Sequence, residues 1–73
     1  MPKFAEVLPK DFLQALLKIG FFVFHQSGSH VRLHHSDGRK VTIAIHSKPL
    51  PKGTFAAILR QANVSRKEFE EAS

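Results

Sequence analysis

Two short stretches of the chain alternate hydrophobic and polar residues, and Asp37-Gly38 lies between them. They cover residues 30–35 and 40–46, and their hydrophobic positions are Val31, Leu33, Val41, Ile43 and Ile45. A period of two sends successive side chains to opposite faces of a strand, and Asp-Gly between two such runs is a signal for a tight hairpin. The pattern predicts an antiparallel pair of strands with one hydrophobic face and one polar face.

The segments before this hairpin predict a helix and a further strand. Pro9-Lys10-Asp11 suits the first turn of a helix, the hydrophobic residues of 12–17 recur at helical spacing, and Gly20 can end the helix in the left-handed conformation. Aromatic and β-branched residues then crowd into 21–26, which is typical of a strand, and a turn follows at 27–29.

The segments after the hairpin predict two helices. Gly53-Thr54 is expected to cap a helix that ends at Asn63, and Ser65-Arg66-Lys67-Glu68 has the pattern of a capping box for a short last helix. The order is therefore helix, three antiparallel strands, helix, short helix. This predicts an α+β fold like that of double-stranded-RNA-binding domains, α-β-β-β-α with a three-stranded antiparallel sheet and a short extra C-terminal helix, whose helices cover one sheet face.

Length and composition limit the classes of protein that the chain can belong to. Seventy-three residues allow one modest core, so residues 1–73 are expected to form one domain. The chain has no cysteine, which excludes a disulfide scaffold and a thiolate zinc site. Its first residues do not resemble a secretory signal and its apolar runs are too short to span a membrane, so a cytoplasmic protein without membrane contacts is expected.

The positive charge of the chain is concentrated in its middle. The formal net charge is +5, and residues 18–60 contain all five histidines and one acid, Asp37. The basic residues of that stretch are Lys18, Arg32, Arg39, Lys40, Lys48, Lys52 and Arg60. This distribution favours an anionic ligand such as RNA, although a basic surface that only keeps the protein soluble has the same composition.

His30, directly after Gly28-Ser29, is the strongest candidate for a catalytic residue. A neutral imidazole can take the proton of a ribose 2′-hydroxyl, which then attacks the adjacent phosphorus. Gly28 and Ser29 would bind substrate through their backbone and hydroxyl groups. The alternative is a histidine at a strand edge that merely faces solvent.

Other residues of the polar face are candidates for substrate binding. His46 is expected on the same face as His30, as an acid for the leaving group or a phosphate ligand, and Arg32, Arg39 and Lys40 could hold phosphates. Each of these cations could equally be an ordinary surface residue. His34 and His35 are expected to point to opposite faces. No spacing matches a zinc motif, so neither a metal nor a cofactor is predicted.

The chain resembles the HicA family of mRNA interferase toxins over about residues 9 to 70. The resemblance rests on the order and spacing of Gly20-Phe21, Gly28-Ser29-His30, Asp37-Gly38-Arg39, Val41-Thr42-Ile43, His46-Ser47, Lys52-Gly53-Thr54 and Ile58-Leu59. It implies a fold like that of double-stranded-RNA-binding domains, metal-independent endoribonuclease activity on mRNA with His30 as the catalytic histidine, and inhibition by a HicB-type antitoxin. Ala44 departs from the family pattern, which usually has proline there.

Two other functions are compatible with the same residues. A non-catalytic RNA-binding module of this fold usually carries a basic cluster at the start of its last long helix, and the residues from Thr54 to Leu59 have none. A small protein-interaction domain would leave the histidines and the positive charge unexplained.

Overall fold

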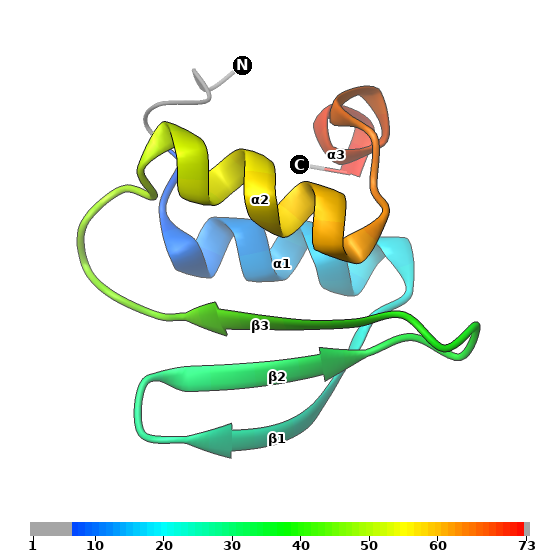
Figure 1. Cartoon of the computed structure of the whole chain (residues 1–73), viewed down its shortest axis with the longest axis horizontal. Helices are drawn as coiled ribbons and strands as arrows, with labels where there is room; N and C mark the ends of the chain where they lie inside the picture. The colour runs from blue at the N-terminus through cyan, green and yellow to red at the C-terminus, as the bar shows by residue number, and fades with distance from the viewer. Residues whose placement is uncertain (1–6, 73) are drawn as a thin grey trace.

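The computed structural model describes residues 7–72, so the N-terminal residues on which the absence of a secretory signal was predicted lie outside it. The elements are α1 (Pro9–Ile19), β1 (Phe22–Ser27), β2 (His30–His34), β3 (Lys40–Ala44), α2 (Lys52–Ala62) and α3 (Arg66–Ala72). The strands form one antiparallel sheet in the order β1-β2-β3 (Figure 1). The predicted α+β fold and the predicted order of elements are confirmed.

The helices pack on one face of β2 and β3. α1 and α2 run in the same direction beside each other, and α3 packs against α1 (Figure 1). The inward residues of the two alternating stretches, Val31, Leu33, Val41 and Ile43, are all buried, as the period of two predicts. We refer below to the opposite face, which carries His30, Arg32, His34, Lys40 and Thr42, as the outer face.

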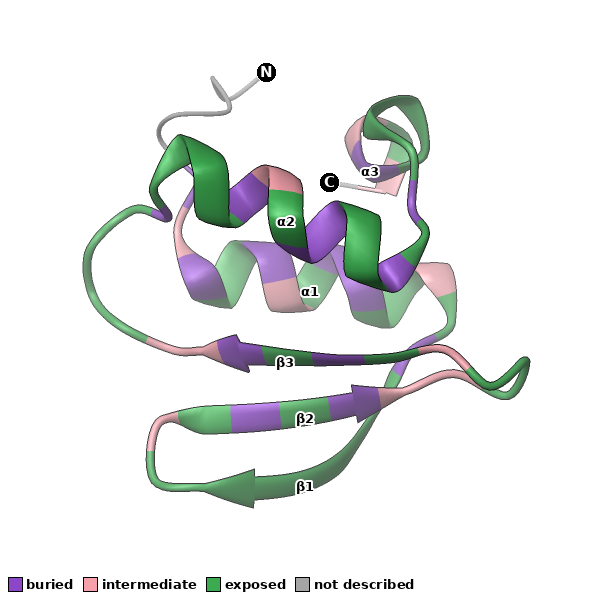
Figure 2. Ribbon diagram, in the orientation of Figure 1, coloured by how far each residue is buried: buried purple, intermediate pink, exposed green. Residues whose placement is uncertain are grey.

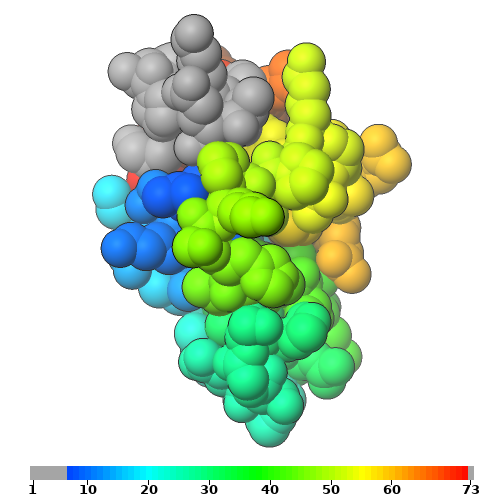
Figure 3. Space-filling model, turned by 90° about the vertical axis from the view of Figure 1, so that its left-hand side faces the viewer, coloured from blue at the N-terminus to red at the C-terminus, as the bar shows by residue number. Residues whose placement is uncertain are grey.

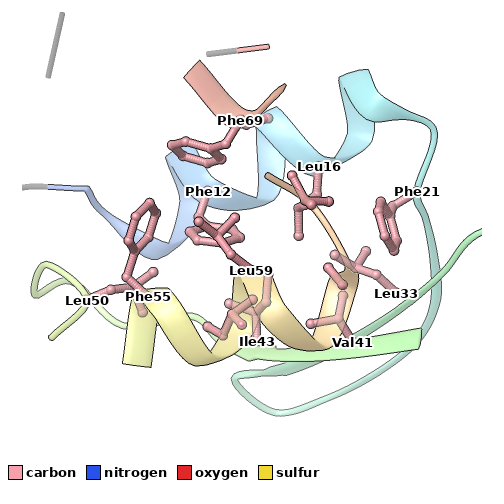
Figure 4. Packing of buried hydrophobic residues seen from close by; sticks show 14 of the residues in the cluster. Phe12, Leu16, Phe21, Leu33, Val41, Ile43, Leu50, Phe55, Leu59 and Phe69 are labelled. Atoms are coloured by element: carbon pink, nitrogen blue, oxygen red, sulfur yellow. The ribbon is translucent and has the colours of Figure 1, made fainter. Parts of the chain in front are cut away.

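Three phenylalanines from three helices form the centre of the core. Phe12 of α1 lies 5.2 Å from Phe55 of α2 and 4.9 Å from Phe69 of α3, measured between ring centroids, and Phe55 lies 5.2 Å from Phe69 (Figure 4). Two of these pairs are edge-to-face, an arrangement that places the positive ring edge on the negative ring face. The short helix α3 is therefore held by one buried aromatic residue, Phe69.

The helix ends follow the predicted signals with one exception. Gly20 (φ 118°) and Asn63 (φ 54°) end α1 and α2 in the left-handed conformation, and the Oγ of Ser65 accepts a hydrogen bond from the N–H of Glu68 at 3.0 Å. The prediction that Gly53-Thr54 caps the second helix is wrong. α2 already begins at Lys52, with Pro51 as its N-cap, because a proline is tolerated where the first helical N–H groups have no partner.

The strand β1 lies outside the region that the helices cover. All six of its residues are exposed, whereas β2 and β3 alternate between buried and exposed positions (Figure 2). Phe22, Val23 and Phe24 are 49%, 47% and 59% exposed. The expectation that helices cover one whole face of the sheet therefore holds only for β2 and β3, since β1 is an edge strand beyond the reach of α1 and α2.

The strand β3 ends earlier than its alternation predicts. It stops at Ala44, and Ile45 and His46 begin the loop to α2. The N–H of Ile45 still donates to the carbonyl of Ser29 at 2.7 Å, so the chain leaves the sheet directly after this bond. His46 is exposed in the loop, and strand alternation no longer determines its direction.

Candidate functional site

The turn between β1 and β2 presents His30 at one end of the sheet. Gly28 and Ser29 form the turn, Ser27 pairs with His30 across it, and Gly28 has a φ of 59°. A Cβ atom on Gly28 would meet nothing within 4 Å, so glycine is favoured here by its left-handed conformation and not by a crowded neighbour. This turn fixes the position of the strand residue that follows it.

The imidazole of His30 lies between two small residues. His30 pairs with Ser27 on β1 and with Ala44 on β3, and side chains of paired residues lie on the same face of a sheet. Because both neighbours are small, His30 stays exposed, and within residues 7–72 its ring has no hydrogen bond or ion pair. The position usually occupied by proline in the resembled family, Ala44, is thus directly opposite His30.

The loop that carries His46 lies beside this turn. Figure 3 faces this end of the molecule and shows the segment around residues 45–50, in yellow-green, next to the blue-green turn around residues 28–30. The hydrogen bond from Ile45 to Ser29 joins the two segments. We call residues 27–30 together with 44–46 the turn end. It brings together four of the predicted site residues, Gly28, Ser29, His30 and His46.

Arg32 and Lys40 continue the outer face away from the turn end. Arg32 pairs with Thr42 and His25, and Lys40 pairs with His34. At a rise of about 3.3 Å per residue, His34 lies about 13 Å along β2 from His30. The outer face is thus long enough to contact more than one nucleotide of a bound strand.

His34 stacks on Phe24 at the far end of the outer face. The ring centroids are 3.9 Å apart and the planes differ by 9°. Desolvation of the ring, and then the positive charges of Lys40 and Arg32, lower the pKa of His34 below its ordinary value, which favours the neutral ring. His34 Nε2 is inaccessible to solvent and has no hydrogen-bond partner among the described residues.

His35 faces the helices, opposite to His34 as predicted. Its ring lies 5.0 Å from that of Phe21 in an edge-to-face contact, and its Nε2 is 3.4 Å from the carbonyl oxygen of Ile19. Its Nδ1 accepts a hydrogen bond from the N–H of Asp37 at 3.2 Å. This histidine joins the end of α1 to the turn between β2 and β3.

Arg39 is also directed toward the helices. Its Nε donates to the carboxylate of Asp37 at 2.9 and 3.1 Å, and its Nη1 donates to the carbonyls of Ala62 and Asn63 at 2.9 and 3.2 Å. The bonds from Arg39 lower the pKa of the Asp37 carboxyl group. The structure therefore separates Arg39 from Arg32 and Lys40, and its predicted contact with substrate stays a prediction.

A groove of about 420 Å³ opens on the outer face away from the turn end. We call it the aromatic groove, and its lining includes Phe24, Arg32, His34, Lys40, Thr42 and Gln61. Of these residues, only Arg32 and Lys40 are among the site residues predicted from sequence; Phe24, His34, Thr42 and Gln61 are not. The run of phenylalanines at 21–24 contains the signal for an exposed aromatic residue, but the register that places Phe24 over His34 cannot be read from it.

Two negative findings apply to the described part of the chain. No three side chains of histidine, aspartate or glutamate within residues 7–72 gather closely enough to hold a metal ion. None of the helices in this range is long and apolar enough to cross a membrane.

Comparison with known protein families gives a match over most of the chain. The model of a family described as the HicA toxin of bacterial toxin-antitoxin matches residues 9–64, which include every element from α1 to α2 and both segments of the turn end. No curated protein matches the chain.

Proposed function

The chain belongs to the HicA toxin family, and from this premise and the geometry of the turn end we propose that it is an endoribonuclease that cleaves mRNA with His30 as the catalytic residue. One observation carries the proposal. An exposed imidazole without a partner among residues 7–72 follows a tight Gly-Ser turn. It lies at the edge of a sheet face on which β2 and β3 place Arg32 and Lys40 and no acidic side chain.

The proposed reaction uses the 2′-hydroxyl of RNA as the nucleophile. His30 removes its proton, the 2′-oxygen attacks the adjacent phosphorus, and the bond to the 5′-oxygen breaks. The products are a 2′,3′-cyclic phosphate and a 5′-hydroxyl, which needs a proton from an acid or from water. We propose His46, in the adjoining loop, as this acid or as a phosphate ligand.

The neighbouring groups would bind the phosphate and stabilise its developing charge. The backbone of Gly28 and the hydroxyl of Ser29 lie at the turn itself, and Arg32 and Lys40 extend the positive face along the strand. Because the turn end is open to water, the electrostatic stabilisation is weaker than in an enclosed site. A single acid-base group contributes about 10²–10⁴-fold, so we expect slow turnover.

The family description implies an antitoxin as the protein partner of the chain, and we propose that this antitoxin is of the HicB type. The exposed turn end supports this proposal, because the described chain has no element that could cover His30. We propose the cytoplasm, where mRNA is available, as the site of action.

The test is cleavage of a single-stranded RNA by the purified protein in the presence of a chelator. We expect fragments that end in a 2′,3′-cyclic phosphate. A substrate with a 2′-deoxyribose at the cleaved position should resist cleavage, because it lacks the nucleophile. Binding without cleavage of either substrate would instead support a non-catalytic RNA-binding module, and cleavage of the deoxy substrate would exclude the proposed nucleophile.

A further inference from the structure

Phe24 presents one face of its ring to His34 and is otherwise exposed. The register between β1 and β2 shifts between Val23 and His25, so His25 takes the place opposite Arg32 and Phe24 is left without a paired residue. This bulge lets the Phe24 ring stack on His34 at 3.9 Å while the residue stays 59% exposed. It is the most exposed large hydrophobic side chain among the described residues.

Positive charge and hydrogen-bonding groups surround this ring. Arg32 and Lys40 line the same groove, as do Thr42 and Gln61, whose side chains contain a hydroxyl and an amide. The strands carry no acidic residue, and Asp37, the one acid between Lys18 and Arg60, is bound to Arg39. An acidic ligand would therefore meet cations without a competing carboxylate.

An aromatic ring flanked by cations matches the chemistry of an unpaired nucleotide. Every nucleobase has a face that can stack on an aromatic side chain, and its phosphates pair with lysine or arginine. Bases inside an A-form duplex are already stacked on each other and cannot offer that face. The lowered pKa of His34 favours the uncharged form of the supporting ring, which does not repel the two cations.

We infer that the aromatic groove is a nucleobase subsite: an unpaired base of the RNA stacks on Phe24, and Lys40 and Arg32 bind the adjoining phosphates. The inference rests on the proposed function for the identity of the ligand as RNA. Since His34, on which Phe24 stacks, is about 13 Å along β2 from His30, the base bound there is not the one at the cleaved bond but a neighbour in the strand. The subsite would contribute to affinity and to the choice of cleavage position.

The test is binding of a non-cleavable, 2′-O-methylated single-stranded oligonucleotide that contains 2-aminopurine, whose fluorescence falls when the base stacks. We expect Phe24→Ala to weaken binding roughly 5- to 100-fold and to abolish the change in fluorescence. Phe24→Tyr should retain both. The slope of log Kd against log salt should stay unchanged in Phe24→Ala and fall by about 0.7 in Lys40→Gln, because only the latter loses a phosphate contact.

Val23→Ala provides the matched control. Val23 belongs to the same strand and is 47% exposed, but it pairs with Leu33 and so lies on the opposite face. We expect it to bind the oligonucleotide as wild type does, and thermal melting checks that all variants are folded. Equal affinities of Phe24→Ala and Val23→Ala, or equal binding of single-stranded and duplex RNA by wild type, would overturn the inference.

Cleavage assays separate this inference from the proposed function. Normal cleavage and product distribution by Phe24→Ala would remove the subsite and leave the nuclease proposal standing. Stacking on Phe24 without any cleavage of unmodified RNA would support the subsite and contradict the nuclease. If Phe24→Ala binds RNA normally but no longer binds the antitoxin, the groove is a protein-docking surface and the inference is wrong.

Discussion

The histidines of this chain differ in their surroundings more than in their sequence context. His35 packs on Phe21 between α1 and the second turn of the sheet, and His34 stacks on Phe24. His30 has only small paired neighbours, and His46 lies in a loop. Acid-base chemistry needs a ring that substrate can reach, which favours His30 and His46 over His34 and His35.

We expect the two candidates to contribute unequally to RNA cleavage. His30→Ala should lower the rate about 10²–10⁴-fold, while His46→Ala should have a smaller effect because a solvent water can protonate the leaving oxygen at the open site. His25→Ala, an exposed histidine of β1, is the control. The measurement is single-turnover cleavage, with circular dichroism to check the fold. A larger loss for His46→Ala would reverse the assignment, and normal cleavage by a folded His30→Ala would exclude His30.

Substitutions of Arg32 and Arg39 distinguish a residue that binds RNA from one that stabilises the fold. Arg32 lies on the outer face, so Arg32→Gln should lower the salt slope of RNA binding by about 0.7 and leave the melting temperature nearly unchanged. Arg39→Gln removes the bonds to Asp37, Ala62 and Asn63, so it should lower the free energy of unfolding by about 1–3 kcal/mol. A lower salt slope for Arg39→Gln with an unchanged free energy of unfolding would instead show that Arg39 binds the phosphate, as predicted from the sequence.

The elements were predictable where a local signal determines them. Gly20, Asn63 and Ser65 mark helix ends, and each acts through its own backbone conformation or side-chain bond. The exposure of β1 was not predictable from its run of phenylalanines, since it depends on how far α1 and α2 reach across the sheet. The early end of β3 likewise depends on where β2 stops offering partners, namely at the bond between Ser29 and Ile45.

The site residues, like the helices and strands, were predictable only where neighbouring residues in the sequence determine their position. His30 and its turn follow from Gly28-Ser29, which lie next to it in sequence. The direction of Arg39 depends on the carbonyls of Ala62 and Asn63, more than twenty residues away, and the stacking of Phe24 depends on a bulge. Long-range contacts of this kind leave no periodic pattern in the sequence.

Gly20, which ends α1, and Gly53, inside α2, provide a matched pair of substitutions for measuring stability. At Gly20, φ is 118° and a Cβ atom would lie 2.8 Å from Nε2 of His35, so Gly20→Ala should cost roughly 1–3 kcal/mol. Gly53, inside α2, has no positive φ and nothing within 4 Å of its Cβ position, so Gly53→Ala should be neutral or stabilise the fold by up to about 1 kcal/mol. Urea unfolding measures both. Equal stabilities of the two variants would contradict the strain expected from a Cβ atom at Gly20.

At the scale of the whole molecule, the two sheet faces have different roles. The inner face of β2 and β3 is buried under α1 and α2, and the charges of the outer face are positive. No described segment crosses the outer face of the sheet (Figure 1). A partner with acidic groups would be steered to this face and would compete with phosphate for the same cations.

We therefore expect the antitoxin to inhibit by covering the turn end. Hydrogen exchange on the isolated complex should show protection of the amides of residues 28–29 and 46–48, which lie in the turn and the loop, together with loss of cleavage. The matched internal control is α3, which packs against α1 and should exchange at the same rate in the free and bound protein. Arg32→Glu should weaken the complex, because a reversed charge repels an acidic partner. Inhibition without protection at 28–29 and 46–48 would mean that the antitoxin acts from another surface, and direct occlusion of His30 would then be excluded.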